Sequence, residues 1–437
     1  MKILEYPRQR KAVLQAFAGA DERDNRNLKL VQRILNDVRE RGDEALADYS
    51  EKFDRKRLVG KAMRVSPRTC QAAWNALNKE LAAALEFAAA GIRAFHQKQV
   101  RKGFVLKRGG VRLEQRLRPL QRIGAYVPGG VATYPSTMLM NVIAAQVAGV
   151  PEIIIATPPV KGDPKAFVPF AVAHMLGVSD RIYQVGGAQA IAALAYGTRT
   201  IPKVDKVVGP GNEFVALGKK LLYGTIDIDS VAGNSEVLII ADATASARYI
   251  AADLLAQAEH TGGESVVVVG IGKKFNFQGI EWELEAQLQN APRAKQARQS
   301  LESGGLFIRV SSGAEAVEVA NLKAPEHLEI MAAGAEKIAD SIYNVGAIFI
   351  GPYTPEPIGD YVAGPNHVLP TGGTARFFSP LGVDAFMKAS NVLQYGRTDF
   401  LKAAPHVITL AESEGLYAHA ESIRVRLEET ESTRKRN

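Results

Sequence analysis

Short runs of β-branched and other apolar residues recur through the second part of this chain, and they constrain its fold more than any other feature. They lie at 153–155, 206–208, 237–240, 266–269 and 347–350. Most are followed by Gly, Pro or Asp and then by a stretch with helical spacing. Strands that are apolar on both faces are typical of a parallel sheet covered by helices on each side. We therefore expect two packed open α/β units, one near 125–235 and one that begins near 236.

The first hundred residues are expected to be mostly helical. Apolar residues at helical spacing predict one helix over about 28–53. Ser66 followed by Pro67 marks the start of a second helix, which we expect to run to about Gln99. Alternating apolar residues between about 104 and 127 predict a hairpin or short strands, and the chain after about 385 is expected to be helical and polar.

The length and composition exclude several classes of protein. The 437 residues leave room for roughly three domains. No uninterrupted apolar run reaches the roughly 18 residues that a membrane helix needs. Arg and Lys stand near the N-terminus where a signal peptide has its apolar stretch. We expect a cytoplasmic protein without a membrane partner.

The net charge of +8 does not point to a nucleic-acid partner. The positive charge is not gathered into one stripe: it is mixed with acidic residues through 21–61, although the segment 98–122 is more basic. No known nucleic-acid-binding motif is present. The preferred interpretation is a solvated basic face that attracts anionic cofactors.

Cys70 is the single cysteine. One cysteine excludes an intramolecular disulfide and any multi-cysteine metal site. Its place in the first turns of a predicted amphipathic helix favours a structural role over that of a nucleophile.

Glycine-rich motifs occupy four places that we expect to follow strands: 123–130, 185–191, 208–212 and 231–236. Glycine lets backbone amides approach a ligand, and a helix that begins after such a turn favours an anion. None of the motifs matches the dinucleotide fingerprint or a P-loop. Each alone is equally consistent with a tight turn, but four together favour a binding cleft.

Gln257 and His260 are three residues apart on a predicted helix, so both side chains can reach one metal ion. The alternative is a helix end at which His260 interacts with the helix dipole. Glu326 and His327 are adjacent and would address different atoms, which suits two proton-transfer groups. Their alternative is a capped helix start with two surface groups.

Asp360 and His367 lie in a segment, 351–374, that is rich in Gly, Pro, Thr and Asn. Such a loop in an α/β protein is often a site, although a long structural connection is the alternative. Glu414 and His419 stand near the C-terminus, where an isolated His is more typical of the surface. Gln, His, Asp and a second His form a mixed donor set that suits zinc, with manganese as an alternative.

Together these motifs resemble the histidinol dehydrogenase family over about residues 25–427. The most specific stretches are GAYVPGG, VGGAQAIAALAYGT, VDKVVGPGN, LLAQAEH, APEHLEI, GPYTPEPIGDYVAGPNHVLPTGGTARF and EGLYAHAESIRVR. The resemblance implies NAD- and zinc-dependent oxidation of L-histidinol to L-histidine. The reaction passes through L-histidinaldehyde in two hydride transfers.

The resemblance also implies roles for particular residues. It places one zinc per subunit on Gln257, His260, Asp360 and His419, and it makes Glu326 and His327 the catalytic acid and base, with His327 expected to titrate near neutral pH. Substrate contacts fall on Ser235, His327, His367 and Glu414 as well as on the metal ligands, and NAD contacts fall on Tyr126, Gln189 and Asn212. The family forms a homodimer in which Glu414 and His419 complete the active site of the neighbouring subunit.

The fold that we predict is α/β, with two packed open α/β (incomplete Rossmann-like) domains and small helical N- and C-terminal elements. The C-terminal element is expected to be exchanged in the homodimer. The predicted division is 1–25 for the N-terminal element, 26–125 with 236–382 for the first α/β domain, 126–235 for the second domain with the NAD contacts, and 383–437 for the C-terminal dimerisation element.

Three residues depart from the family's pattern. Asn234 stands where the family usually has Pro, Phe214 where it often has Tyr, and Phe378 where it usually has a small polar residue. These changes leave the predicted ligands intact but are compatible with a paralogous zinc- and NAD-dependent dehydrogenase of another amino alcohol or hydroxy compound. A zinc hydrolase is a further alternative, but it would not need the glycine-rich motifs.

Overall fold

The computed structural model describes residues 1–18, 24–129, 134–231 and 233–434. Its contacts divide the chain into two units. Unit 1 comprises Met1–Val100 and Leu120–Phe386, and unit 2 comprises Arg101–Pro119 and Met387–Asn437. None of the helices in the described ranges is long and apolar enough to cross a membrane.

Unit 1 contains a five-stranded parallel sheet in the order β6-β5-β4-β7-β8. Its strands are β4 (Arg122–Tyr126), β5 (Glu152–Thr157), β6 (Ile182–Gln184), β7 (Lys206–Val208) and β8 (Asp227–Ile228). The helices between them are α6 (Pro135–Ala148), α7 (Val168–Met175), α8 (Gly187–Tyr196) and α9 (Glu213–Leu222). This order is that of a doubly wound sheet, in which strands are added first on one side of β4 and then, from β7 on, on its other side.

Unit 1 also contains a six-stranded parallel sheet in the order β1-β11-β10-β9-β12-β13. Its strands are β1 (Lys2–Glu5), β9 (Glu236–Ala241), β10 (Ser265–Ile271), β11 (Gly305–Val310), β12 (His327–Met331) and β13 (Ala347–Ile350). Apart from β1 at its edge, this sheet repeats the strand order of the first sheet.

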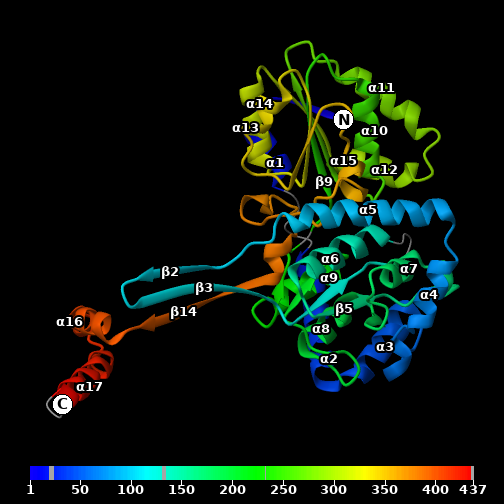
Figure 1. Cartoon of the computed structure of the whole chain (residues 1–437). Coiled ribbons are helices and arrows are strands. Elements are labelled where there is room, and N and C mark those ends of the chain that lie inside the picture. Colours follow the sequence, from blue (N-terminus) through cyan, green and yellow to red (C-terminus); the bar gives the residue numbers. More distant parts are fainter. Residues whose placement is uncertain (19–23, 130–133, 232, 435–437) are drawn as a thin grey trace. The chain divides into compact units, whose positions relative to one another are not determined.

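Helices cover both faces of the six-stranded sheet (Figure 1). One face carries α10 (Ala247–Ala258), α11 (Phe277–Leu288) and α12 (Ala294–Gly304), and the other carries α1 (Arg10–Phe17), α13 (Gly313–Lys323) and α14 (Ala335–Ala339). The predicted α/β class is confirmed, and so are the strands expected from the apolar runs. Their valines and isoleucines are almost fully buried, as expected for a sheet covered on both sides, except in the edge strand β13, where Ile350 is exposed.

The expectation of one long helix after Ser66 is wrong. The structure has α4 (Pro67–Asn75) and α5 (Lys79–Gln97), and the side chain of Asn78 caps α5 by accepting a hydrogen bond from the amide of Leu81. Cys70 is buried within α4, where burial raises the pKa of its thiol to about 11. A thiol that stays protonated is a poor nucleophile, which agrees with the structural role expected for Cys70.

The helices α2 (Asp24–Arg41) and α3 (Asp43–Asp54) pack against α8 of the five-stranded sheet. The division predicted from the sequence grouped these helices with the six-stranded sheet instead. The N-terminal segment, expected as a separate element, supplies the edge strand β1. The domain boundaries themselves stay a prediction.

Unit 2 consists of an antiparallel sheet in the order β14-β3-β2, followed by two helices. The sheet is formed by β2 (Phe104–Arg108), β3 (Val111–Pro119) and β14 (Met387–Tyr395), and the helices are α16 (Arg397–Ser413) and α17 (Tyr417–Arg434). The predicted hairpin is therefore confirmed, whereas the helical expectation after 385 missed β14. Figure 1 shows the three strands side by side, as their antiparallel pairing requires.

Candidate functional site

The candidate site lies at the amino ends of β9 and β12, which are neighbours in the six-stranded sheet. Glu236 is the first residue of β9 and His327 is the first residue of β12. The end of α10 and the segment around Asp360 meet them there, through the contacts described below. Residues far apart in the sequence are thus brought together, as the motifs predicted for Gln257, His327 and Asp360.

His327 is almost fully buried, at 3% exposure, and its two ring nitrogens have different surroundings. Nδ1 lies 3.0 Å from Oε1 of Gln257 and 3.2 Å from the carbonyl oxygen of Glu236. Both neighbours accept hydrogen bonds, so the proton belongs on Nδ1. Nε2 has no hydrogen-bond partner among the described residues and lies 3.9 Å from Oδ1 of Asp360. The lone pair of Nε2 is therefore free to accept a proton.

Burial lowers the pKa of His327 to about 4, and Asp360 opposes that effect in part. The expectation that His327 titrates near neutral pH is wrong for this structure, because a buried imidazole loses the hydration of its charged form. The ring is neutral at neutral pH, which is the protonation state that a base needs.

Glu326 is also buried, and its Oε2 accepts a hydrogen bond of 2.9 Å from the amide of Glu236. Burial raises the pKa of Glu326 well above its usual value, while a hydrogen bond from Ser235 opposes the shift. Oε2 of Glu326 lies 3.7 Å from Nδ1 of His327. The structure thus brings together Glu326, His327 and Ser235, three residues that were predicted for the site.

Glu356 is a site residue that the sequence analysis did not single out. It begins α15 (Glu356–Tyr361), and its amide donates a hydrogen bond of 2.8 Å to Oε1 of Glu329. Its own Oε2 is buried without a partner in the described structure. His327, Glu356 and Asp360 each offer one ligand atom, and these atoms lie within 4.8 Å of one another. The sequence motif contained Glu356, but only the fold shows that it faces His327.

The carboxyl groups in and around the cluster of His327, Glu356 and Asp360 repel one another when they are ionised. Burial raises the pKa of Glu356, and the charges of Asp360, Glu326 and Glu329 raise it further. Asp253, which shares a hydrogen bond with Glu329, has a pKa raised to about 6 by burial. A cation bound among these groups would relieve that repulsion.

Gln257 and His260 do not share one helix face, because α10 ends at Ala258. The chain turns just after His260, where Gly262 has φ +97° and the carboxylate of Glu264 accepts three successive amide hydrogen bonds, from residues 261–263. Nδ1 of His260 lies 2.9 Å from the carbonyl oxygen of Gln257. The pair is therefore still close, but it is joined by a turn.

Asp360 and His367 are held together by their own segment. Nδ1 of His367 lies 3.0 Å from the carbonyl oxygen of Asp360 and 4.0 Å from its Oδ1. The neighbouring Asn366 is buried and donates a hydrogen bond of 3.0 Å to the carbonyl oxygen of Met140 in α6. This contact connects the candidate site to the five-stranded sheet within unit 1.

Asn234 stands where the family pattern has proline, and its side chain fixes the turn by a hydrogen bond. Its side-chain amide donates a hydrogen bond of 2.7 Å to the carbonyl oxygen of Gly263, in the turn after His260. The backbone amide of Gly233 donates a hydrogen bond of 2.5 Å to Oγ1 of Thr371. The turn before Ser235 is thus fixed at two points without the proline ring.

The predicted NAD contacts lie at the carboxyl ends of strands in the five-stranded sheet. Tyr126 ends β4, Gln189 lies in the first turn of α8 after β6, and Asn212 caps α9 after β7. The hydroxyl of Tyr126 accepts a hydrogen bond of 3.2 Å from the amide of Gly187. Residue 130, the last of the first glycine motif, lies outside the described residues.

The fourth glycine motif follows the short strand β8, as expected, and it also leads into β9. Residues 233–235 lead into β9, so Ser235 and Glu236 stand at the amino edge of the six-stranded sheet. β8 ends at Ile228, and the intervening segment connects the two sheets. Residue 232 of this motif is outside the described ranges.

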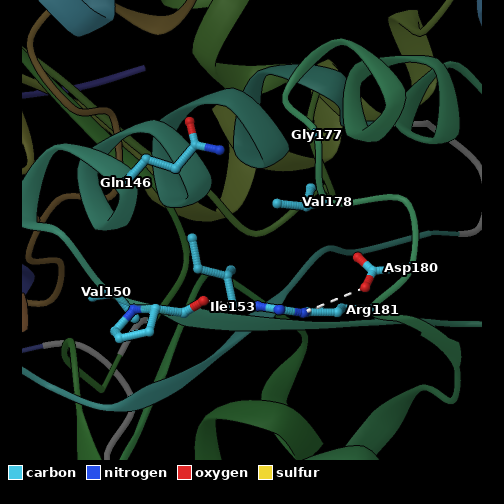
Figure 2. A pocket seen from close by; sticks show the side chains of 8 residues that line it. Gln146, Val150, Ile153, Gly177, Val178, Asp180 and Arg181 are labelled. Atoms are coloured by element: carbon cyan, nitrogen blue, oxygen red, sulfur yellow. Dashed lines mark hydrogen bonds and ion pairs between the residues drawn. The ribbon is translucent and has the colours of Figure 1, made fainter.

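A hollow of about 470 Å³ lies elsewhere in unit 1, at the amino ends of β5 and β6 (Figure 2). Arg181 there donates a hydrogen bond of 2.8 Å to the carbonyl oxygen of Pro151 and lies 3.7 Å from Oδ2 of Asp180. The predicted NAD contacts stand at the opposite, carboxyl edge of this sheet, and the hollow is lined by none of the predicted site residues.

Glu414 and His419 belong to unit 2, and both are exposed. Glu414 follows α16, and His419 lies in the first turn of α17. Within one chain they have the surface positions expected for residues of this kind. Their contribution to a neighbouring subunit stays a prediction.

The comparisons with known proteins agree with one another. The family model for histidinol dehydrogenase matches residues 19–427. The histidinol dehydrogenase of Bacillus cereus ATCC 14579 is 46% identical over 416 residues and covers 93% of this chain and 95% of its own. That of Streptococcus mutans is 49% identical over 398 residues and covers 91% and 92%. The crystal structure of histidinol dehydrogenase from Elizabethkingia anophelis matches with a TM-score of 0.91 at 34% identity over 99% of both chains.

Proposed function

Since this chain belongs to the histidinol dehydrogenase family, we propose that it oxidises L-histidinol to L-histidine through L-histidinaldehyde, with zinc and NAD bound. The observation that carries the proposal is the free Nε2 of a buried, neutral His327 beside Asp360 and Glu326. The net reaction consumes one alcohol, two NAD⁺ and one water. It yields one carboxylate, two NADH and three protons. Histidine biosynthesis is the pathway, and the cytoplasm stays the predicted location.

His327 acts as the base in the first oxidation. Its Nε2 accepts the proton of the substrate hydroxyl while hydride leaves the same carbon. The contacts of Nδ1 with Gln257 and Glu236 hold the ring in the tautomer whose Nε2 is unprotonated. When bound, NAD accepts the hydride.

Glu326 acts in the second oxidation, where water adds to the aldehyde. The raised pKa of Glu326 makes its carboxylate a stronger base than an ordinary glutamate once it has lost its proton. Glu326 takes a proton from the attacking water. His327, after it has released its first proton to solvent, takes one from the resulting gem-diol as the second hydride leaves. Keeping the aldehyde bound between the steps protects it from side reactions.

The residues present fit a zinc ion. Gln257, His260 and Asp360 supply one amide oxygen, one imidazole and one carboxylate, and His419 of the partner subunit would supply the second imidazole. The buried atoms Nε2 of His327 and Oε2 of Glu356 carry lone pairs and lack partners in the described structure, as expected around a site built for a ligand. Bound zinc would hold the imidazole and the amine of histidinol as a template.

The surface of unit 2 supports a homodimer with shared active sites. Its buried apolar side chains in the described ranges are Val111, Ala404, Ala411 and Ala420. Large apolar side chains are exposed instead: Phe104, Val105, Leu106, Leu393, Tyr395, Val407, Leu410, Leu416, Tyr417 and Val425. A three-stranded sheet with so little core needs a cover, and a second copy of this chain provides one.

Metal removal tests the proposed zinc site. We expect treatment with EDTA to abolish the histidinol-dependent reduction of NAD, and added zinc to restore it. His260→Asn should carry less zinc than the wild type by elemental analysis, because one imidazole ligand is lost. His406→Asn, which changes an exposed histidine of α16, is the matched control and should keep its zinc. Full activity in metal-free protein would contradict the zinc proposal.

A further inference from the structure

A buried ion pair holds the loop that follows β7. Lys219 of α9, at 1% exposure, pairs with Asp229, which follows β8 and has a side chain at 4% exposure. Nζ of Lys219 also donates a hydrogen bond of 3.1 Å to the carbonyl oxygen of Gly209, and Oδ2 of Asp229 accepts one of 2.7 Å from the amide of Gly209. The ammonium group of Lys219 and the carboxylate of Asp229 therefore hold the carbonyl oxygen and the amide of the same residue, Gly209.

Gly209 stands where the five-stranded sheet reverses its winding. Its φ is +110°, and a Cβ there would lie 2.2 Å from the carbonyl oxygen of Tyr126 and 2.9 Å from Nδ2 of Asn141. The backbone after β7 is thus in contact with the end of β4. In doubly wound sheets, ligands bind in the crevice beyond the carboxyl ends of the strands at this reversal. Asn212, a predicted NAD contact, follows Gly209 by three residues.

The pair is not easily explained by stability alone. Removing two charges from water costs about as much as their attraction returns, so a buried ion pair is weak evidence for stability. α9 is already anchored by the buried side chains of Val215, Leu217 and Leu222. What Lys219 and Asp229 add to that packing is a fixed position for the peptide groups of Gly209.

We infer that Lys219 and Asp229 are positioning residues for NAD binding. They hold residues 209–212 in the conformation that forms one wall of the cofactor crevice, without touching the cofactor themselves. The inference rests on the proposed function, since it requires that NAD binds at this edge of the sheet. Loss of either charge leaves the other buried and unpaired, so the loop loses one of its two anchors.

The test compares this pair with a second ion pair on the same strands. Lys219→Met and Asp229→Asn each break the pair at the carboxyl edge, and Asp229→Asn does so with almost no change in shape. Lys206→Met is the control, because Nζ of the buried Lys206 bonds Oδ2 of Asp227 at 2.8 Å at the opposite ends of β7 and β8. The measurements are the dissociation constant for NAD by calorimetry, the zinc content, the KM for each substrate, and the melting temperature.

We expect both pair variants to weaken NAD binding about tenfold or more, the scale of losing hydrogen bonds to a charged group. The KM for NAD should rise while kcat at saturating NAD, zinc content and the KM for histidinol stay within about twofold. Lys206→Met should lower the melting temperature but leave NAD binding unchanged.

Two results separate the inference from the proposed function. If the wild type binds NAD and the folded variants bind it equally well, the inference is contradicted and the proposed function is untouched. If NAD, zinc and histidinol binding all weaken together, the pair has a general structural role and the inference is also contradicted. A wild type that binds no NAD contradicts both.

Discussion

His327→Asn is expected to lower kcat by about 10² to 10⁴, the range that one positioned base contributes. The asparagine amide can still donate to Oε1 of Gln257, but it has no basic nitrogen at the place of Nε2. The free lone pair beside Asp360 is therefore lost while the surrounding contacts remain. The measurement is kcat with saturating histidinol and NAD, together with the zinc content.

The control for this variant is His174→Asn, which changes a partly buried histidine of α7 outside the site. It should keep the wild-type kcat. A His327→Asn protein that binds zinc and turns over at the wild-type rate would remove His327 from the mechanism. Loss of zinc together with activity would instead assign His327 a role in holding the metal.

Mixing two inactive variants should restore activity if the sites are shared between subunits. His260→Asn and His419→Asn each remove one proposed zinc ligand, so each homodimer should be inactive. In a mixed dimer one site carries both substitutions and the other carries neither. Random exchange makes about half of the dimers mixed, so the expected recovery is about a quarter of the wild-type activity.

The recovery should follow the formation of mixed dimers, measured by mass spectrometry of subunits that carry different tags. Wild-type protein exchanged with itself is the control for activity lost during exchange. Confirmed mixed dimers without activity would contradict the shared site. Full activity of the His419→Asn homodimer would contradict the assignment of His419 as a ligand.

Local patterns predicted many of the elements of this fold. The valine-rich and isoleucine-rich runs predicted buried parallel strands, and these strands are buried in both sheets except for the edge strand β13. Two errors had local signals that were available. Asn78 is a good helix cap, which divides α4 from α5, and the Thr261-Gly262-Gly263-Glu264 turn ends α10 before His260.

Other features depend on contacts that no local pattern contains. The pairing of β9 with β12 brings Glu236 beside His327, and only the strand order of the whole sheet determines it. Glu356 and Glu329 meet because α15 begins against β12, and the burial that lowers the pKa of His327 follows from the same packing. The alternative of a capped helix start at 324–329 is wrong, because residues 327–331 form the buried strand β12. The Lys219–Asp229 pair likewise joins α9 to the end of β8 only in the folded sheet.

The most direct test of the account is the number of NADH molecules formed for each L-histidinol consumed by the zinc-loaded protein. We expect two, with L-histidine as the product and no release of the aldehyde. A ratio of one with free aldehyde would contradict the second oxidation and the role of Glu326. No turnover of histidinol by folded, zinc-loaded protein would contradict the proposed substrate.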